Sequence, residues 1–168
     1  MKKQATLSEI QRLLRNLNRV GVVTHVNTAD ALCRVQTGGM TTSWLNWLTR
    51  RAGRSRDWWA PSIGEQVLIL SIGGELDTAF VLPGIYSDAN PAPSASADAY
   101  HVSFPDGAAF EYEPATGALT VSGIKTADIT ASESITPTLP PVTVRASTRL
   151  TLVTPEVLCT NKLFTGTM

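Results

Sequence analysis

The sequence predicts an all-β protein in which one N-terminal helix precedes a small barrel and a threonine-rich tail of short strands. Apolar residues at helical spacing occur within the first 18 positions. Short apolar or alternating runs separated by turn residues then fill most of residues 19–122. The last 52 residues hold twelve threonines, seven charged residues and one aromatic residue. Since β-branched residues suit a pleated surface, this tail is also expected to be β-structured.

The helix is expected within residues 1–18. Thr6 and Glu9 have the spacing of a capping box, in which each side chain accepts a hydrogen bond from a backbone N–H near the other residue. Two interpretations remain open: the helix packs on its own domain, or it docks against partner copies. The candidate docking residues share one apolar face and are Leu7, Ile10, Leu14 and Leu17.

A small β-barrel is expected at residues 19–88, because about five short strands separated by turns lie within this span. A basic loop at residues 50–56 interrupts them. The expected strands are 20–26, 31–36, 41–48, 65–72 and 79–82.

Residues 89–99 are poor in large apolar groups and rich in Pro, Ala and Ser, which predicts a linker or an extended surface crossing. Three alternating runs follow, joined by the turn sequences PDG and PATG. The corresponding strands are expected at 100–104, 108–113 and 118–121.

Residues 100–168 are predicted to form a shaft built from several copies of the chain. A single ribbon of such strands has no second layer to cover its apolar face, and its edges remain open to strand addition. A threefold intertwined β-helix would bury one face of every strand and pair the edges between chains. A register slip of one residue would reverse the faces. The residues expected on the axis are Leu119, Val121, Ile129, Val142, Val144, Leu150, Leu152 and Val157.

The formal net charge of zero hides an asymmetry. Residues 1–60 carry a net charge of +7 and residues 61–168 a net charge of −7. No run approaches the ~18 apolar residues of a membrane helix, so an integral membrane protein is not expected. Cys33 and Cys159 lack the spacing of a zinc site or a disulfide framework, and both are interpreted as small buried apolar residues.

No enzymatic site is expected. His25 and His101 have no carboxylate or nucleophile at a suggestive spacing. Glu111 and Glu113 are two apart on one predicted strand and are interpreted as part of a solvated face. The Gly73–Gly74 pair lacks the context of a phosphate-binding loop and indicates a turn.

Residues 58–86 (WWAPSIGEQVLILSIGGELDTAFVLPGIY) resemble the baseplate assembly protein V family, the central tail spikes of contractile-tailed phages. The stretch HVSFPDGAAFEYEPATGALTVSG at 101–123 and the Thr/Val-rich tail fit the same family, so the resemblance covers essentially the whole chain. It implies a homotrimer with an OB-like barrel that docks on the tail hub and other baseplate components. It also implies a virion protein, assembled in the host cytoplasm, whose β-helical needle pierces the host outer membrane on contraction.

The family's needle usually ends in a His-x-His motif whose three copies hold an iron ion at the apex. Neither histidine of this sequence lies in such a motif, so no cofactor and no tip metal are expected in this chain. The C-terminal pattern suggests that the apex is missing from the sequence or is supplied by a separate tip protein.

The alternative function is an OB-fold protein that binds single-stranded nucleic acid through aromatic side chains in a basic groove. Arginines next to tryptophans suit such a groove, but they are also enriched at protein interfaces. Structural docking is favoured, since the acidic, threonine-rich tail has no role in a strand-binding protein. The candidate docking residues are Trp44, Trp47, Arg50, Arg51, Trp58 and Trp59.

Overall fold

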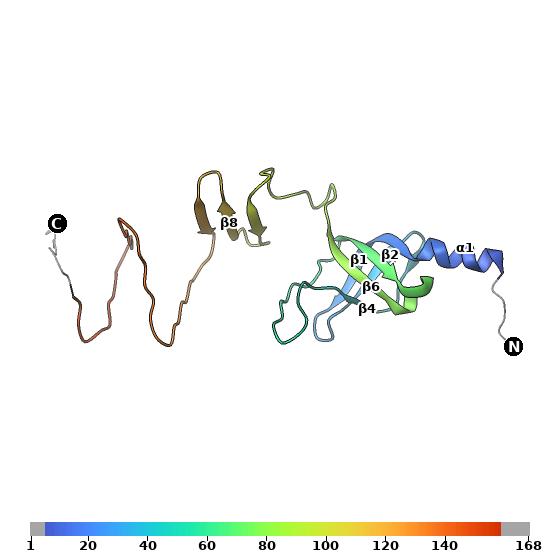
Figure 1. The fold of residues 1–168 in the computed structure, drawn as a ribbon, viewed down its shortest axis with the longest axis horizontal. Helices are drawn as coiled ribbons and strands as arrows, with labels where there is room; N and C mark the ends of the chain where they lie inside the picture. The colour runs from blue at the N-terminus through green and yellow to red at the C-terminus, as the bar shows by residue number, and fades with distance from the viewer. Residues whose placement is uncertain (1–5, 159–168) are drawn as a thin grey trace. The chain divides into compact units, whose positions relative to one another are not determined.

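The computed structural model describes residues 6–158 of the chain. The chain divides after Lys125 into two units, which are described separately below. The first unit holds the regular elements of the described chain (Figure 1). They are α1 (Leu7–Asn16), β1 (Asn18–Asn27), β2 (Leu32–Thr37), β3 (Met40–Thr41), β4 (Leu45–Trp47), β5 (Gln66–Ser71), the 3-10 turns η1 (Ile72–Gly74) and η2 (Leu76–Thr78), β6 (Ala79–Ile85), β7 (Tyr100–Ser103), β8 (Ala109–Glu113) and β9 (Ala118–Ser122).

Five strands close into a barrel in the order β1-β5-β6-β4-β2, and β2 pairs back with β1. The short β3 pairs with the end of β2. All of these pairings are antiparallel except β4 with β6. Gly21 permits the closure, since a Cβ there would lie 2.5 Å from Val35 Cγ1 and 2.6 Å from the Gln36 carbonyl oxygen. A closed five-stranded barrel of this kind agrees with the predicted OB-like domain.

The barrel has its own apolar core. Alternate residues of β1, β2, β5 and β6 point inward, as the period of a strand requires. Cys33 is fully buried in this core, as predicted. The core residues are Val23, Cys33, Val35, Leu45, Val67, Ile69, Ala79 and Val81.

Two strand predictions needed correction. The expected strand at 41–48 is divided into β3 and β4, because Thr42 turns inward and its hydroxyl accepts a hydrogen bond from the Val35 N–H at 3.1 Å. The expected strand at 79–82 continues to Ile85 through Pro83.

A three-stranded antiparallel sheet, β7-β8-β9, follows the barrel in the first unit. The predicted hairpin sequences join its strands, and Gly107 and Gly117 take the positive φ angles that these turns need. Residues 91–99, which lie within the predicted linker at 89–99, contain no helix or strand. The domain boundaries at 19–88, 89–99 and 100–168 otherwise stay predictions.

Residues 123–158 contain no strand in this single chain, and every side chain from 114 to 158 is exposed. The β-helical shaft therefore stays a prediction. The alternating apolar pattern is present, but within the described residues no strand pairs with residues 123–158. Cys159 lies outside the described residues.

Candidate interaction surfaces

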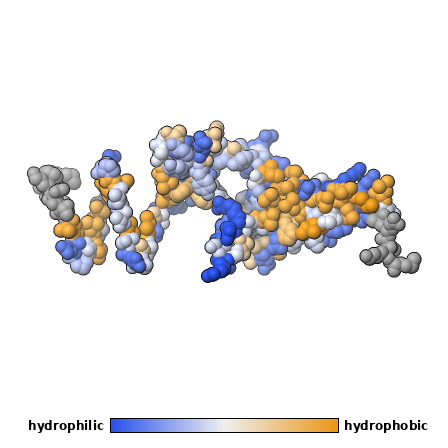
Figure 2. Space-filling model, viewed as in Figure 1, coloured by the Kyte–Doolittle hydropathy of each residue, from blue (hydrophilic) through white to orange (hydrophobic). Residues whose placement is uncertain are grey.

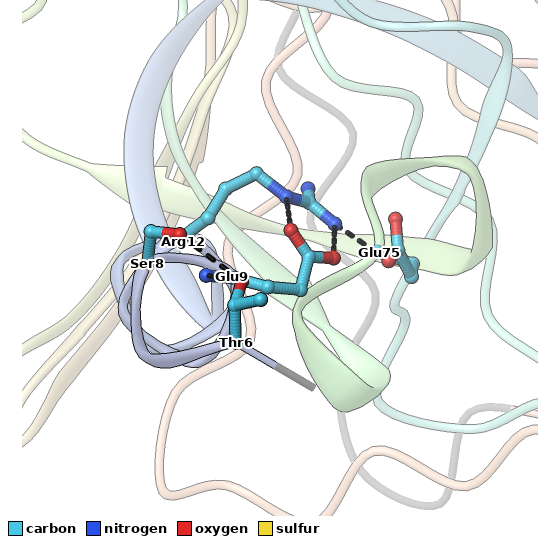
Figure 3. Close-up of polar contacts among 5 residues, drawn as sticks. All are labelled: Thr6, Ser8, Glu9, Arg12 and Glu75. Carbon is cyan, nitrogen blue, oxygen red and sulfur yellow. Dashed lines mark hydrogen bonds and ion pairs between the residues drawn. The ribbon is translucent and has the colours of Figure 1, made fainter. Parts of the chain in front are cut away.

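The start of helix α1 is fixed by polar contacts at its first turn (Figure 3). Thr6 is the N-cap, and its hydroxyl accepts from the Glu9 N–H at 3.4 Å, as predicted. The Glu9 carboxylate does not complete the capping box. It accepts instead from Arg12, which lies 2.8 Å away, and Arg12 also donates to Glu75 at 2.9 Å. These bonds lower the pKa of Glu9 and raise that of Arg12.

Helix α1 contacts its own barrel through its backbone. The Ser71 N–H donates to the Leu17 carbonyl at 2.8 Å. Gly74 is buried against the Leu13 backbone, and a Cβ there would collide with the Leu13 carbonyl. Together with the Arg12–Glu75 pair, these contacts fix which side of the helix faces the barrel.

As a result, the predicted docking face of α1 is turned away from the barrel. Leu7 and Leu14 are 72% and 61% exposed, and no residue of the helix is buried. The helix packs on its own domain through Leu13 and polar groups, while its apolar stripe remains uncovered. We call the residues of this face, Leu7, Ile10, Leu14 and Leu17, the helix stripe.

The basic loop after β4 is organised around one carboxylate. Asp57 accepts from the Thr49 hydroxyl, from the Arg51 N–H at 2.8 Å and from Arg50 Nε at 3.1 Å. These hydrogen bonds, with that from Thr49 the strongest, lower the pKa of Asp57 to about 2. The Asp57 carboxylate thus ties Thr49, Arg50 and Arg51 together, which gives the loop a defined charged surface.

The four tryptophans do not share one platform and do not fill the barrel core. Trp47 packs against the core and meets Trp58 edge to face at 5.5 Å. Trp44 lies elsewhere, with the Arg34 guanidinium 5.9 Å from its ring centroid. Trp59 stacks on Phe104 at 6.0 Å, so one face of its ring is occupied. Trp44, Trp58 and Trp59 are each more than 40% exposed.

A groove of about 720 Å³ adjoins this loop in the first unit. Its walls include Arg50, Asp57, Trp59, Tyr86 and Tyr100. The groove thus joins the candidate docking residues Arg50 and Trp59 to aromatic side chains of β7 and of the chain after β6. Sequence reasoning missed Tyr86 and Tyr100, because the residue spacing carries no sign of their position beside the loop.

The predicted axis residues are all large apolar side chains exposed to solvent in the single chain. Their exposed fractions range from 49% for Val121 to 79% for Ile129. Leu119 and Val121 lie on β9. The others, Ile129, Val142, Val144, Leu150, Leu152 and Val157, lie in the second unit.

Sequence reasoning was wrong about the surroundings of one histidine. His101 and Glu111 are direct cross-strand partners on β7 and β8, and His101 Nδ1 lies 2.6 Å from Glu111 Oε2. Glu111 is therefore paired, whereas Glu113 accepts from the Ala115 N–H, which lowers its pKa. Among residues 6–158, no Ser, Thr or Cys side chain forms a hydrogen bond with either member of the His101–Glu111 pair. Burial raises the pKa of the Cys33 thiol to about 11, which makes it a poor nucleophile.

Within residues 6–158, no cluster of three or more His, Cys, Asp or Glu side chains could hold a metal ion. The two histidines of the sequence are also not in a His-x-His pair. The absence of a tip metal from this chain stays a prediction. Among the described residues, no helix has the length and apolar character needed to cross a bilayer.

The closed barrel, the uncovered helix stripe and the exposed large apolar side chains of residues 119–157 are typical of a component that functions by association with other chains. Comparison with known proteins agrees. Residues 19–86 match the type VI secretion system/phage-baseplate injector OB domain, and residues 138–168 match the phage spike trimer family. The chain is 66% identical over 168 residues to the spike protein of Escherichia phage P2, covering all of this chain and 80% of that protein.

The chain belongs to the phage baseplate spike family. It is a structural component of the virion tail baseplate and not an enzyme. The match to the spike trimer family indicates a homotrimer.

Proposed function

We propose that this spike attaches to the tail hub through residues 1–86 and pierces the host outer membrane with a shaft formed by residues 100–168 during tail contraction. The observation that carries the proposal is the row of large apolar side chains at 119–157, all uncovered in the single chain. An isolated soluble chain rarely exposes so much apolar surface without a partner. Two further copies of the same chain supply that partner.

Three copies wound around one axis would bury one face of each strand and satisfy the open strand edges. Leu119, Val121, Ile129, Val142, Val144, Leu150, Leu152 and Val157 would then face the axis. The threonine hydroxyls would lie on the outside and bind water, giving a shaft with few charges. Interlocked chains of this kind unfold slowly, which suits a part that is loaded by force.

Hub attachment is assigned to the basic loop and the tryptophans beside it. Arg50 is held by Asp57 at the edge of the aromatic groove, and Arg51 extends from the same loop. Aromatic and arginine side chains are the types that protein interfaces favour. The partner surface is therefore expected to be acidic and to accept Trp58 or Trp59. Assembly of spike and hub takes place in the host cytoplasm, before the virion is released.

Phages carrying Val144→Asp test the piercing role, with Thr143→Asp as the matched control on the neighbouring, outward-facing position. We expect the Val144→Asp particles to adsorb to cells but to lose plating efficiency and to release no ions from the host. The Thr143→Asp particles should infect normally. Full infectivity of Val144→Asp particles that lack a shaft would contradict the piercing role.

A further inference from the structure

The start of the linker between β6 and β7 lies against the barrel. Ser87 and Asn90 exchange backbone hydrogen bonds of 3.1 and 3.0 Å, which turns the chain. The Asn90 side-chain amide donates to the Gly64 carbonyl at 3.4 Å and ties this turn to the loop before β5. Pro91 and Pro93 then line a cavity of about 280 Å³ together with residues of the barrel and of β7. The linker therefore begins in contact with both parts that it connects.

One aromatic pair joins the loop after β4 to the end of β7. The rings of Trp59 and Phe104 are stacked, with centroids 6.0 Å apart and planes inclined by 8°. Phe104 is fixed in the tight turn after β7, because its N–H donates to the Ala108 carbonyl at 2.9 Å and its carbonyl accepts from the Gly107 N–H at 3.0 Å. A stacked aromatic pair contributes free energy beyond the area that it buries. The pair thus connects the sheet to the barrel from outside the barrel core.

A polar contact reaches the other end of β7. Figure 2 shows the loop at 50–56, which leaves the barrel between β4 and β5, as a hydrophilic projection. Arg50 begins this loop and donates to Asp57 at 3.1 Å. The Asp57 carboxylate and the Tyr100 hydroxyl, in that order of strength, raise the pKa of Arg50. Arg50 therefore contacts the first residue of β7, whereas Trp59 stacks on the residue after its end.

We propose that a junction lock joins the barrel to the β7–β9 sheet so that the two move together. The lock consists of Arg50, Trp59, Tyr100 and Phe104. Residues 91–98 are exposed and form no helix or strand, so little in the linker itself resists bending. The resistance comes instead from the two side-chain contacts across it. The mechanical role of the lock, which is to pass a push on the barrel to the shaft, rests on the proposed piercing function.

The lock divides the candidate docking residues of the loop into two groups. Arg50 and Trp59 are positioning residues that orient the sheet. Within residues 6–158, Arg51 and Trp58 line neither the groove nor the cavity, and they remain available to an acidic hub.

A double-mutant cycle in the full chain tests the lock. Trp59→Ala and Phe104→Ala are introduced singly and together, and unfolding of the barrel by denaturant is followed by the fluorescence of the remaining tryptophans. All four tryptophans precede the linker, so this signal reports on the barrel and not on the sheet. Because each substitution removes the same contact, we expect their effects on the unfolding equilibrium constant to fall short of multiplying by about three- to tenfold.

Trp44→Ala combined with Phe104→Ala is the matched control cycle. Trp44 is 44% exposed, compared with 55% for Trp59, and it lies beside Arg34 on the barrel. The effects of Trp44→Ala and Phe104→Ala should multiply within about twofold. Phe104→Leu takes the place of Phe104→Ala if the alanine chain does not fold, since leucine keeps an apolar side chain but lacks the stacked ring.

Hydrogen exchange in the linker measures the restraint itself. Trp59→Ala and Phe104→Ala should each speed exchange of the bonded amides in the turn at 87–90 by about threefold or more. Trp44→Ala should leave this exchange unchanged. Multiplying effects in the first cycle, or unchanged exchange in the linker, would overturn the junction lock. The piercing role would stand in either case, because it is judged from the infectivity of the Val144→Asp particles.

Discussion

The barrel and the tail use the same strand pattern with opposite results. In the barrel, alternate residues meet across a closed ring, and Val35, Val67, Ile69 and Val81 lose all contact with water. In residues 126–158 the same alternation leaves every side chain exposed. The difference lies in closure, because the barrel pairs its first strand with both β2 and β5, whereas residues 126–158 form no paired strand. The alternation of apolar residues thus specifies only which face of a strand is apolar. Whether that face is buried depends on other strands or other chains that pack against it.

The largest expected effect is on the tail. Val144→Asp places three carboxylates near the proposed axis, where desolvation and like-charge repulsion oppose assembly. We expect loss of the trimer, measured as a fall in mass by light scattering. The barrel should remain folded, and its four tryptophans report on it alone because the chain has no tryptophan after Trp59. Thr143→Asp is the control and should remain trimeric.

A protease-resistant Val144→Asp trimer would show that Val144 does not face the proposed axis. If Thr143→Asp dissociated instead, the strand would have the opposite register, in which the neighbouring residues face inward.

The second prediction concerns the barrel core. Ile69→Ala removes a side chain with no exposed surface and should lower the free energy of unfolding of the barrel by about 2–5 kcal/mol. Denaturant unfolding followed by tryptophan fluorescence measures this change. Ile63→Ala removes the same atoms from an exposed turn, and its effect should stay within about 0.5 kcal/mol. Equal effects of the two substitutions would show that the Ile69 side chain is not buried in the barrel core.

The third prediction separates two neighbouring glycines. Gly73 and Gly74 both have positive φ angles, of 69° and 80°, but only Gly74 lies against the helix backbone. Gly73→Ala should cost about 1 kcal/mol through backbone strain. Gly74→Ala should cost about 1–2 kcal/mol more, because its Cβ would displace Leu13. Hydrogen exchange of the α1 amides should therefore accelerate only in Gly74→Ala.

The smallest expected effect concerns the basic loop. The pKa of Asp57 is lowered to about 2, so the folded loop favours the carboxylate over the acid. The stabilisation of the folded loop by the ionised Asp57 carboxylate is complete above about pH 4 and is lost as the pH falls through 2. Asp57→Asn should remove it at neutral pH and speed tryptic cleavage between Arg50 and Arg56 several-fold. Asp88→Asn, at an exposed position outside the loop, should leave the cleavage rate unchanged.

Much of the barrel could be predicted because its signals are local. Turn residues fixed most strand boundaries, and the helical spacing of Leu7 and Leu14 located α1. The errors arose where distant residues decide the outcome. Thr42 leaves the strand because its hydroxyl accepts a hydrogen bond from the Val35 N–H. The Glu9 carboxylate accepts from Arg12, which also donates to Glu75. His101 meets Glu111 only through the register of β7 and β8.

The sequence by itself determined the order of helix, barrel and threonine-rich tail, as well as the family, because periodicity, turn residues and motif residues act over a few positions. Only the tertiary structure decided which apolar faces are covered. Gly74 and Ser71 hold α1 so that the helix stripe points outward while Leu13 faces the barrel, and the register of β1, β5 and β6 places uncharged side chains together on the outside of the barrel. The physical reason is that burial depends on what lies opposite a side chain in space, which spacing along the chain does not specify.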